Sequence, residues 1–254
     1  MGYKVGALIL ATSKNRDSWK MMQDTYLFNL TLKSFLLTHD KEHDYIFYIG
    51  IDKGDRIFDN ETQQREITRF SKVYKNIEFK FVTIENIEKG HVTVMWNKLF
   101  DYAYAGGCDY FYQCGDDIQF KTNGWVNDSI RVMIENDNLG ITGPKNNNNR
   151  ILTQAFVSRK HMEIFGWFFP AEIKNWCCDD WYNMVYHPKY LFPLNNHLAE
   201  NNGGQPRYDI DNNPNFTGGN NIRFSMNTKA LREQTMKLAT NHKLLIEAHL
   251  KKSK

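Results

Sequence analysis

The most informative stretch of the chain is Tyr110-Phe111-Tyr112-Gln113-Cys114-Gly115-Asp116-Asp117-Ile118-Gln119-Phe120. Apolar and aromatic residues lead into two adjacent carboxylates, and the apolar character resumes at Ile118. This pattern predicts a buried strand over 109–114 that ends at the carboxylate pair, where an α/β sheet forms its ligand crevice. Adjacent carboxylates repel each other, which favours a hard divalent cation between them and a diphosphate as its partner. A solvated turn is the simpler alternative, but the apolar flanks disfavour it.

The segments before this stretch alternate between strand and helix patterns. Apolar runs and period-two alternation predict strands at 3–12, 44–51 and 77–84. Helical spacing of apolar residues predicts helices at 20–37, at 62–74, and from Val92 to the Gly106-Gly107 pair. Such alternation predicts an α/β fold, with a mostly parallel sheet covered by helices on both faces.

The chain after the carboxylate pair is less regular. Apolar spacing predicts a helix near 124–136, strands at 139–144 and 151–157, and a helix over Arg159–Phe165 that Ser158 could cap. Residues 187–221 are rich in Asn, Gly, Asp and Pro, so they predict a long loop, either a binding loop or a disordered one. An amphipathic helix is predicted over 228–250.

Composition excludes some classes of function and leaves others open. The 254 residues are 41% hydrophobic, 14% aromatic and carry a net charge of only +3, too weak to predict nucleic-acid binding. The four cysteines form no C-x-x-C pair, which disfavours zinc and favours free thiols in a reducing compartment. The apolar run at 5–11 is too short to span a membrane and has no clear cleavage site, so we expect a cytoplasmic protein without a transmembrane segment.

A second carboxylate pair lies in Trp176-Cys177-Cys178-Asp179-Asp180-Trp181-Tyr182. Acidic residues among aromatic ones are typical of a helix N-terminus, where the helix dipole and free N–H groups favour negative charge. A role in proton transfer is compatible with that position, because a general base must be ionised and close to the proton that it takes.

The chain resembles the nucleotide-sugar-dependent glycosyltransferases of the GT-A fold over roughly residues 3–186. Gly115-Asp116-Asp117 stands where the family has an Asp-x-Asp motif after the fourth strand, with glycine in place of the first carboxylate. The resemblance implies a Rossmann-like N-terminal half and a loop-rich acceptor half. It also implies that Asp117 and Asp116 hold Mn²⁺ or Mg²⁺ on the diphosphate of a UDP- or GDP-linked sugar.

The resemblance also implies further site residues. The residues implied to contact the nucleotide are Thr12, Ser13 and Arg16 after the first strand, Asp52 after the second, Asn97 in the strong helix, and Asp116. Asp180, with Asp179 beside it as the helix cap, matches the general base of inverting members. His197 is the candidate for a further metal ligand, and an ordinary surface histidine is the alternative.

These observations predict one domain over residues 1–254. Residues 1–120 would form its nucleotide-sugar half, 121–226 its acceptor half and 227–254 a C-terminal helix. The predicted activity is metal-dependent transfer of a sugar to a hydroxyl of a glycan or protein, with inversion slightly favoured. Two alternatives stay open: a silent nucleotide-sugar or glycan-binding module, which Gly115 suggests, and a nucleotidyltransferase, which would need glycines that residues 12–16 lack.

Overall fold

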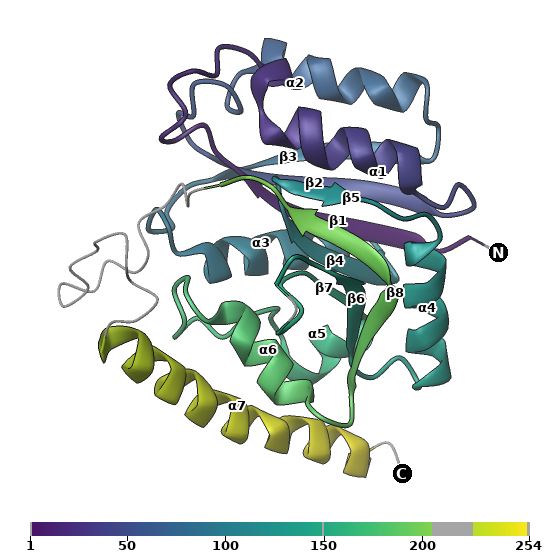
Figure 1. Ribbon diagram of the computed structural model, residues 1–254, viewed down its shortest axis with the longest axis vertical. Coiled ribbons are helices and arrows are strands. Elements are labelled where there is room, and N and C mark those ends of the chain that lie inside the picture. Colours follow the sequence, from purple (N-terminus) through teal and green to yellow (C-terminus); the bar gives the residue numbers. More distant parts are fainter. Residues whose placement is uncertain (1, 149, 205–225, 253–254) are drawn as a thin grey trace.

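The computed structural model describes residues 2–148, 150–204 and 226–252. Within these ranges the chain forms one sheet of eight strands in the order β3-β2-β1-β4-β7-β6-β8-β5, with helices on both faces (Figure 1). This arrangement confirms the predicted α/β fold with a mostly parallel, Rossmann-like sheet.

The first half of the chain supplies the parallel part of the sheet. Its strands are β1 (Lys4–Ala11), β2 (Asp44–Asp52), β3 (Ile77–Ile84) and β4 (Tyr110–Gly115). Its helical segments are η1 (Met22–Asp24), the π-helical η2 (Leu27–Leu32), α1 (Lys33–Thr38), α2 (Glu61–Thr68), the 3-10 segment η3 (Arg69–Lys72) and α3 (Val92–Ala105). Strand β1 pairs in parallel with β2 and β4, and β2 pairs in parallel with β3. The carboxyl ends of these four strands therefore share one edge.

The second half adds strands of mixed direction. Its elements are β5 (Ile118–Phe120), α4 (Trp125–Glu135), β6 (Ile141–Lys145), β7 (Ala155–Ser158), α5 (Arg159–Phe165), α6 (Cys178–Tyr186) and β8 (Leu191–Asn201). Strand β7 is antiparallel to both β4 and β6. Ser158 caps α5 as predicted, because its side chain accepts a hydrogen bond from the Lys160 N–H at 3.1 Å.

Strand β8 corrects the predicted loop at 187–221. Its first half pairs in parallel with β6, and Ala199–Asn201 pair antiparallel with β5. Because β5 reaches only that last part, Pro193 lies where β8 is an edge, and proline is tolerated there. Asparagine and proline are depleted in strands, so the local sequence does not predict a strand here. The segment is recognised as a strand only by its pairing with the distant strands β6 and β5. Residues 205–221 of the predicted loop lie outside the described residues.

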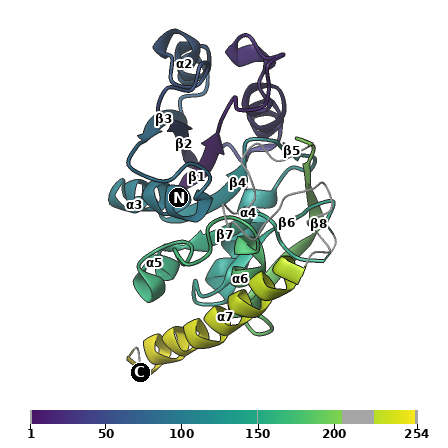
Figure 2. The same cartoon turned by 90° about the vertical axis from the view of Figure 1, so that its left-hand side faces the viewer.

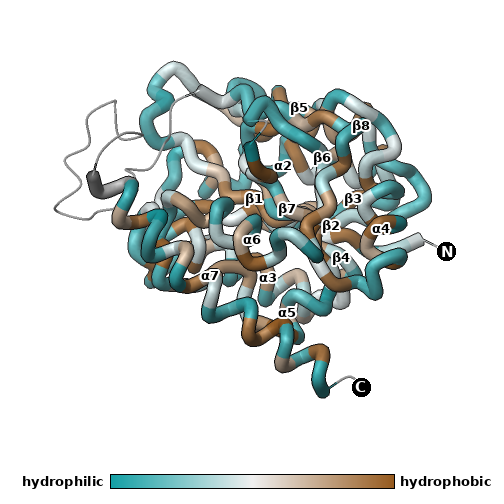
Figure 3. The backbone as a smooth tube through the Cα atoms, turned by 60° about the horizontal axis from the view of Figure 1, so that its bottom comes forward, coloured by the Kyte–Doolittle hydropathy of each residue, from teal (hydrophilic) through white to brown (hydrophobic). Residues whose placement is uncertain are grey.

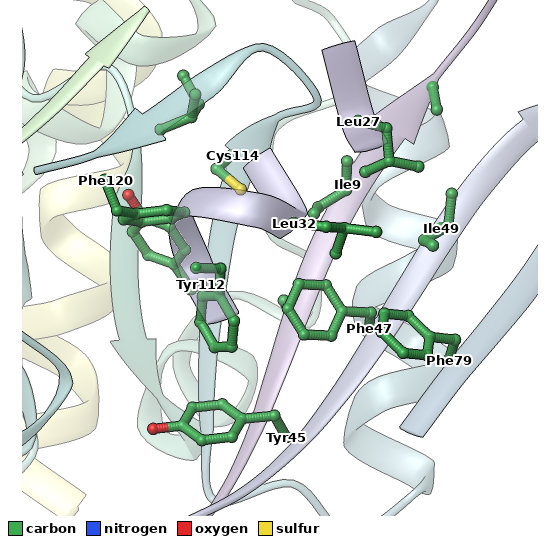
Figure 4. Packing of buried hydrophobic residues seen from close by; sticks show 14 of the residues in the cluster. Ile9, Leu27, Leu32, Tyr45, Phe47, Ile49, Phe79, Tyr112, Cys114 and Phe120 are labelled. Carbon is green, nitrogen blue, oxygen red and sulfur yellow. The ribbon is translucent and has the colours of Figure 1, made fainter. Parts of the chain in front are cut away.

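Two hydrophobic clusters fill the space on the two faces of the sheet. Alternate residues of β1 divide between them: Ile9 belongs to one and Leu8 to the other, and both are fully buried. The cluster of Figure 4 packs β1, β2 and β4 against the segment 27–38 and α4, with Phe47 and Tyr112 among its aromatic members. The second cluster packs α3, α5 and α6 against the opposite face.

The C-terminal helix α7 (Met226–Lys252) lies across α5 and α6, far from α1 and α2 (Figures 1 and 2). Apolar and polar residues alternate along it (Figure 3), and its buried residues include Thr235, Ala239 and Ile246. The prediction of a helix here is confirmed. Among the described residues, no helix combines the length and the apolar character that crossing a bilayer requires.

Candidate active site

The carboxyl edge of the parallel strands gathers the residues predicted to bind the nucleotide. Thr12 and Ser13 follow β1, Asp52 ends β2, and Asp116 and Asp117 form the turn between β4 and β5. Strand β1 lies between β2 and β4, so its end separates Asp52 from the carboxylate pair. In open α/β sheets ligands bind at this edge, which makes it the candidate donor side of the site.

The two carboxylates of the pair have different surroundings. Asp116 is fully buried, whereas Asp117 is partly exposed. A Cβ atom at Gly115 would lie 2.4 Å from the Asp117 Oδ1, and one at Gly203 would lie 2.0 Å from its Oδ2. The backbone N–H of Asn202 also donates to the Asp117 carbonyl at 3.0 Å. Asp117 therefore lies enclosed between two glycines, one before the turn and one just beyond β8.

This enclosure gives a physical reason for the glycine at position 115. Any side chain at 115 would overlap the Asp117 carboxylate, so the first acid of the family pattern and this placement of Asp117 exclude each other. The chain keeps the carboxylate that the resemblance assigns to the metal, and Gly115 makes room for it.

His197, the predicted further metal ligand, contacts residues at the start of α4, so its role as a ligand stays a prediction. Its Nδ1 lies 3.1 Å from the Thr122 hydroxyl and its Nε2 lies 2.8 Å from the Asp128 Oδ2. Both ring nitrogens are therefore engaged at the start of α4. In the described part of the chain, no three His, Cys, Asp or Glu side chains come together as a metal-binding group.

The turn after β1 is organised by Asp55, a residue that the sequence analysis missed. Its carboxylate accepts hydrogen bonds from the hydroxyls of Thr12 (3.1 Å) and Ser13 (2.9 Å) and from the Ser13 N–H (2.7 Å). Thr12 and Ser13 are only 3% and 5% exposed. Their side chains thus shape the turn, and a ligand would meet the turn through other groups.

Arg16 extends from this turn toward the carboxylate pair. Its guanidinium donates to the Gly203 carbonyl at 3.2 Å, and Gly203 packs directly on Asp117. Contacts with the rings of Trp19 and Tyr26, at 5.9 and 5.6 Å from their centroids, hold the same group in place. The guanidinium is therefore held at Gly203, the residue that packs on the partly exposed carboxylate.

Asn97, predicted to contact the nucleotide, makes hydrogen bonds within the protein through its side chain. Its Oδ1 accepts the N–H groups of Phe168 and Phe169 at 3.0 and 2.8 Å, and its Nδ2 donates to the Phe169 carbonyl at 2.8 Å. Both sides of the amide are engaged, so Asn97 joins α3 to the loop after α5.

The second carboxylate pair opens α6, as predicted, although the residue at the N-cap is Cys177. The Asp180 Oδ1 lies 3.3 Å from the Arg150 guanidinium and 3.8 Å from that of Arg232 in α7. The Asp179 Oδ1 accepts the Asp180 N–H at 3.0 Å. Burial raises the pKa of Asp179 to about 6, and the like charge of Asp180 adds to the rise.

The aromatic residues around this pair belong largely to the core. Trp181 is fully buried and donates from Nε1 to the Nδ1 of His242 at 3.0 Å, so it is no platform for a sugar. Burial raises the pKa of the Tyr182 phenol well above its ordinary value, and Asp179 and Tyr112 contribute to the rise.

Among known proteins, the chain shares its fold with solved structures of a bacterial protein. No family model and no curated protein matches the chain. Among solved structures it is similar to the glycosyltransferase TarS of S. aureus. In complex with UDP, TarS 1-349 aligns with a TM-score of 0.52 and 13% identity over 78% of this chain and 60% of that chain. The same TarS fragment in complex with UDP-GlcNAc aligns with a TM-score of 0.52 and 14% identity, over 80% of this chain and 60% of that chain.

At this level of identity the similarity extends to the fold alone. The chain also spans less than two thirds of the TarS fragment. The chain therefore shares the α/β fold of TarS, whereas its assignment to the GT-A fold in particular stays a prediction.

Proposed function

We propose that the protein is a metal-dependent glycosyltransferase that moves a sugar from a UDP- or GDP-linked donor to a hydroxyl of a glycan or protein. The observation that carries this proposal is the position of Asp116 and Asp117. They end a buried parallel strand at the ligand-binding edge of a fold shared with TarS, whose structures contain UDP and UDP-GlcNAc.

On the donor side, the nucleoside diphosphate would lie across the ends of β1, β2 and β4. Arg16 supports this placement, because its guanidinium is held at Gly203 near Asp117 and its positive charge would attract the negatively charged diphosphate. Asp52, at the end of β2, is the candidate contact to the base or ribose. Thr12 and Ser13 would contribute through the backbone of their turn.

Asp117 would be the main ligand of the metal, and the buried Asp116 would assist it. Mg²⁺ and similar hard cations are commonly bound by one or two carboxylates together with substrate phosphates and water, so the pair fits such an ion without a third protein ligand. When bound, Mn²⁺ or Mg²⁺ would offset the negative charge that develops on the departing nucleoside diphosphate.

On the acceptor side, Asp180 would take the proton of the attacking hydroxyl. The acceptor oxygen would then form a bond to the anomeric carbon of the sugar as the bond from that carbon to the diphosphate oxygen breaks, which inverts the configuration. Arg150 and Arg232 both approach the Oδ1 of Asp180, so Oδ2 is the atom proposed to accept the proton. Asp179 would support the start of the helix.

A panel of UDP- and GDP-sugars with Mn²⁺ tests the activity, with release of the nucleoside diphosphate as the measured quantity. Asp180→Asn should reduce transfer by about a hundredfold, the scale of losing a general base, while donor affinity is retained. Glu163→Gln on α5 is a control that should transfer normally. Full activity of Asp180→Asn would contradict the role of this base. Binding without release would favour the silent module, and release of pyrophosphate would favour nucleotidyl transfer.

A further inference from the structure

The turn that follows β2 contains a carboxylate that joins it to the turn after β1. The Asp55 Oδ2 accepts the Ser13 N–H and the Thr12 hydroxyl, and its Oδ1 accepts the Ser13 hydroxyl. The same Oδ1 also accepts the N–H groups of Ile57 and Phe58 at 3.0 and 2.9 Å. Five donors from two separate segments therefore converge on one side chain.

The surroundings of Asp55 make this junction firm. Ile57 and Phe58 are 1% and 0% exposed, so the segment that carries Asp55 is anchored in the core. Burial alone would raise the pKa of Asp55, but the donors from Phe58, Ser13 and Ile57 outweigh it and lower the pKa below its usual value. The carboxylate is therefore ionised at neutral pH, and hydrogen bonds to an ionised acceptor are the stronger kind.

The next residue, Arg56, joins the same two segments a second time. Its guanidinium donates to the carbonyl of Arg16 at 2.5 Å and to the carbonyl of Trp19. The Arg16 N–H in turn donates to the Ser13 carbonyl at 3.2 Å, which closes the turn that Asp55 holds. The backbone of Arg16 is thus fixed from the β2 side, and its side chain reaches Gly203 beside Asp117.

We propose that Asp55 is a positioning residue for the nucleoside diphosphate: it shapes the turn after β1, and through that turn it positions Arg16, whose guanidinium reaches Gly203 next to Asp117. Asp55 itself would not touch the ligand, because both of its oxygens are occupied by the two turns. This inference rests on the proposed function, since it assumes that a nucleoside diphosphate binds at the edge formed by β1, β2 and β4.

The test is the dissociation constant of UDP with Mn²⁺, measured by calorimetry for the full chain, with GDP as a comparison. Asp55→Asn replaces one acceptor oxygen with a donor NH₂ group, and should raise the dissociation constant by about tenfold, a factor equivalent to about 1.4 kcal/mol. Asp109→Asn is the matched control. Asp109 accepts the Lys4 N–H at 2.8 Å at the opposite end of β1, so its substitution should affect thermal stability and leave the UDP affinity unchanged.

A double substitution separates positioning from general weakening of the fold. If Asp55 acts through Arg16, then Arg16→Gln should raise the dissociation constant much less in the Asp55→Asn background than in the wild type. The proposal would be overturned if the dissociation constant of the double variant rose by the product of the two single-variant factors. It would also be overturned if Asp55→Asn bound UDP as tightly as the wild type.

Two further outcomes have a defined meaning. If Asp55→Asn does not fold, Ser13→Ala removes one of the hydroxyl bonds, and it must still raise the dissociation constant severalfold for the inference to survive. Absence of UDP and GDP binding by the wild type would instead refute the proposed function, before Asp55 is tested.

Discussion

At the scale of single residues, the site depends on side chains that leave room for one another. Asp117 occupies the space that a side chain at position 115 would need, and Gly203 closes the other side. The glycine that departs from the family pattern is therefore part of the arrangement that places the carboxylate.

We expect Gly115→Ala to weaken metal-dependent binding of UDP by about tenfold, the equivalent of 1.4 kcal/mol, because the added methyl group displaces the Asp117 carboxylate. Gly6→Ala, near the amino end of β1, is the control. The added Cβ would also be crowded, at 3.1 Å from the Ala103 Cβ, but it would lie in the core and away from Asp117. That control should lower the melting temperature and leave UDP affinity intact. Equal UDP affinities for Gly115→Ala and the wild type would show that Asp117 can move without consequence.

At the scale of elements, helices α5 and α6 are joined by a buried histidine. His161 lies 2.8 Å from the Tyr186 hydroxyl through Nδ1 and 3.1 Å from the Phe168 carbonyl through Nε2. Burial lowers the pKa of His161 from 6.5 to about 4, so the imidazole is neutral at pH 7. Since a carbonyl only accepts, Nε2 of the neutral ring carries the proton and Nδ1 accepts from the Tyr186 hydroxyl.

This histidine predicts a loss of stability in acid. Below pH 6.5 the unfolded chain takes up a proton that the folded chain accepts only near pH 4, so the free energy of unfolding should fall across that window. The full effect of one such group is about 3 kcal/mol. Urea unfolding of the wild type and of His161→Gln at pH 7.5 and pH 5 checks it. The advantage of the wild type over the variant should shrink at pH 5, and a constant difference would contradict this account.

At the scale of the whole molecule, the sequence predicted what depends on local pattern. The apolar run at 77–84, the helix from Val92 and the cap at Ser158 follow from neighbouring residues, and all three are present. Asp116 and Asp117 could be predicted to end a buried strand because their flanks are apolar. The edge that they share with the ends of β1 and β2 follows from the order of the parallel strands.

Features that depend on distant partners could not be predicted in this way. Strand β8 contains asparagine and proline, and is a strand because β6 and β5 pair with it. Asp55 lies more than 40 positions from the Thr12 and Ser13 that it holds, and no local pattern distinguishes it from Asp52. The sequence left His197 as either a metal ligand or an ordinary surface histidine, and it could not show that folding places Asp128 beside it.

The central claim is that Asp117 binds a nucleoside diphosphate through a divalent metal. The most direct measurement is the affinity for UDP with and without Mn²⁺, by calorimetry, in the wild type and in Asp117→Asn. We predict that Mn²⁺ strengthens UDP binding to the wild type by at least about tenfold, a difference of 1.4 kcal/mol, and that Asp117→Asn removes most of this gain while it melts at the same temperature without ligand. An Asp117→Asn protein that keeps the full Mn²⁺-dependent gain in affinity would contradict the account.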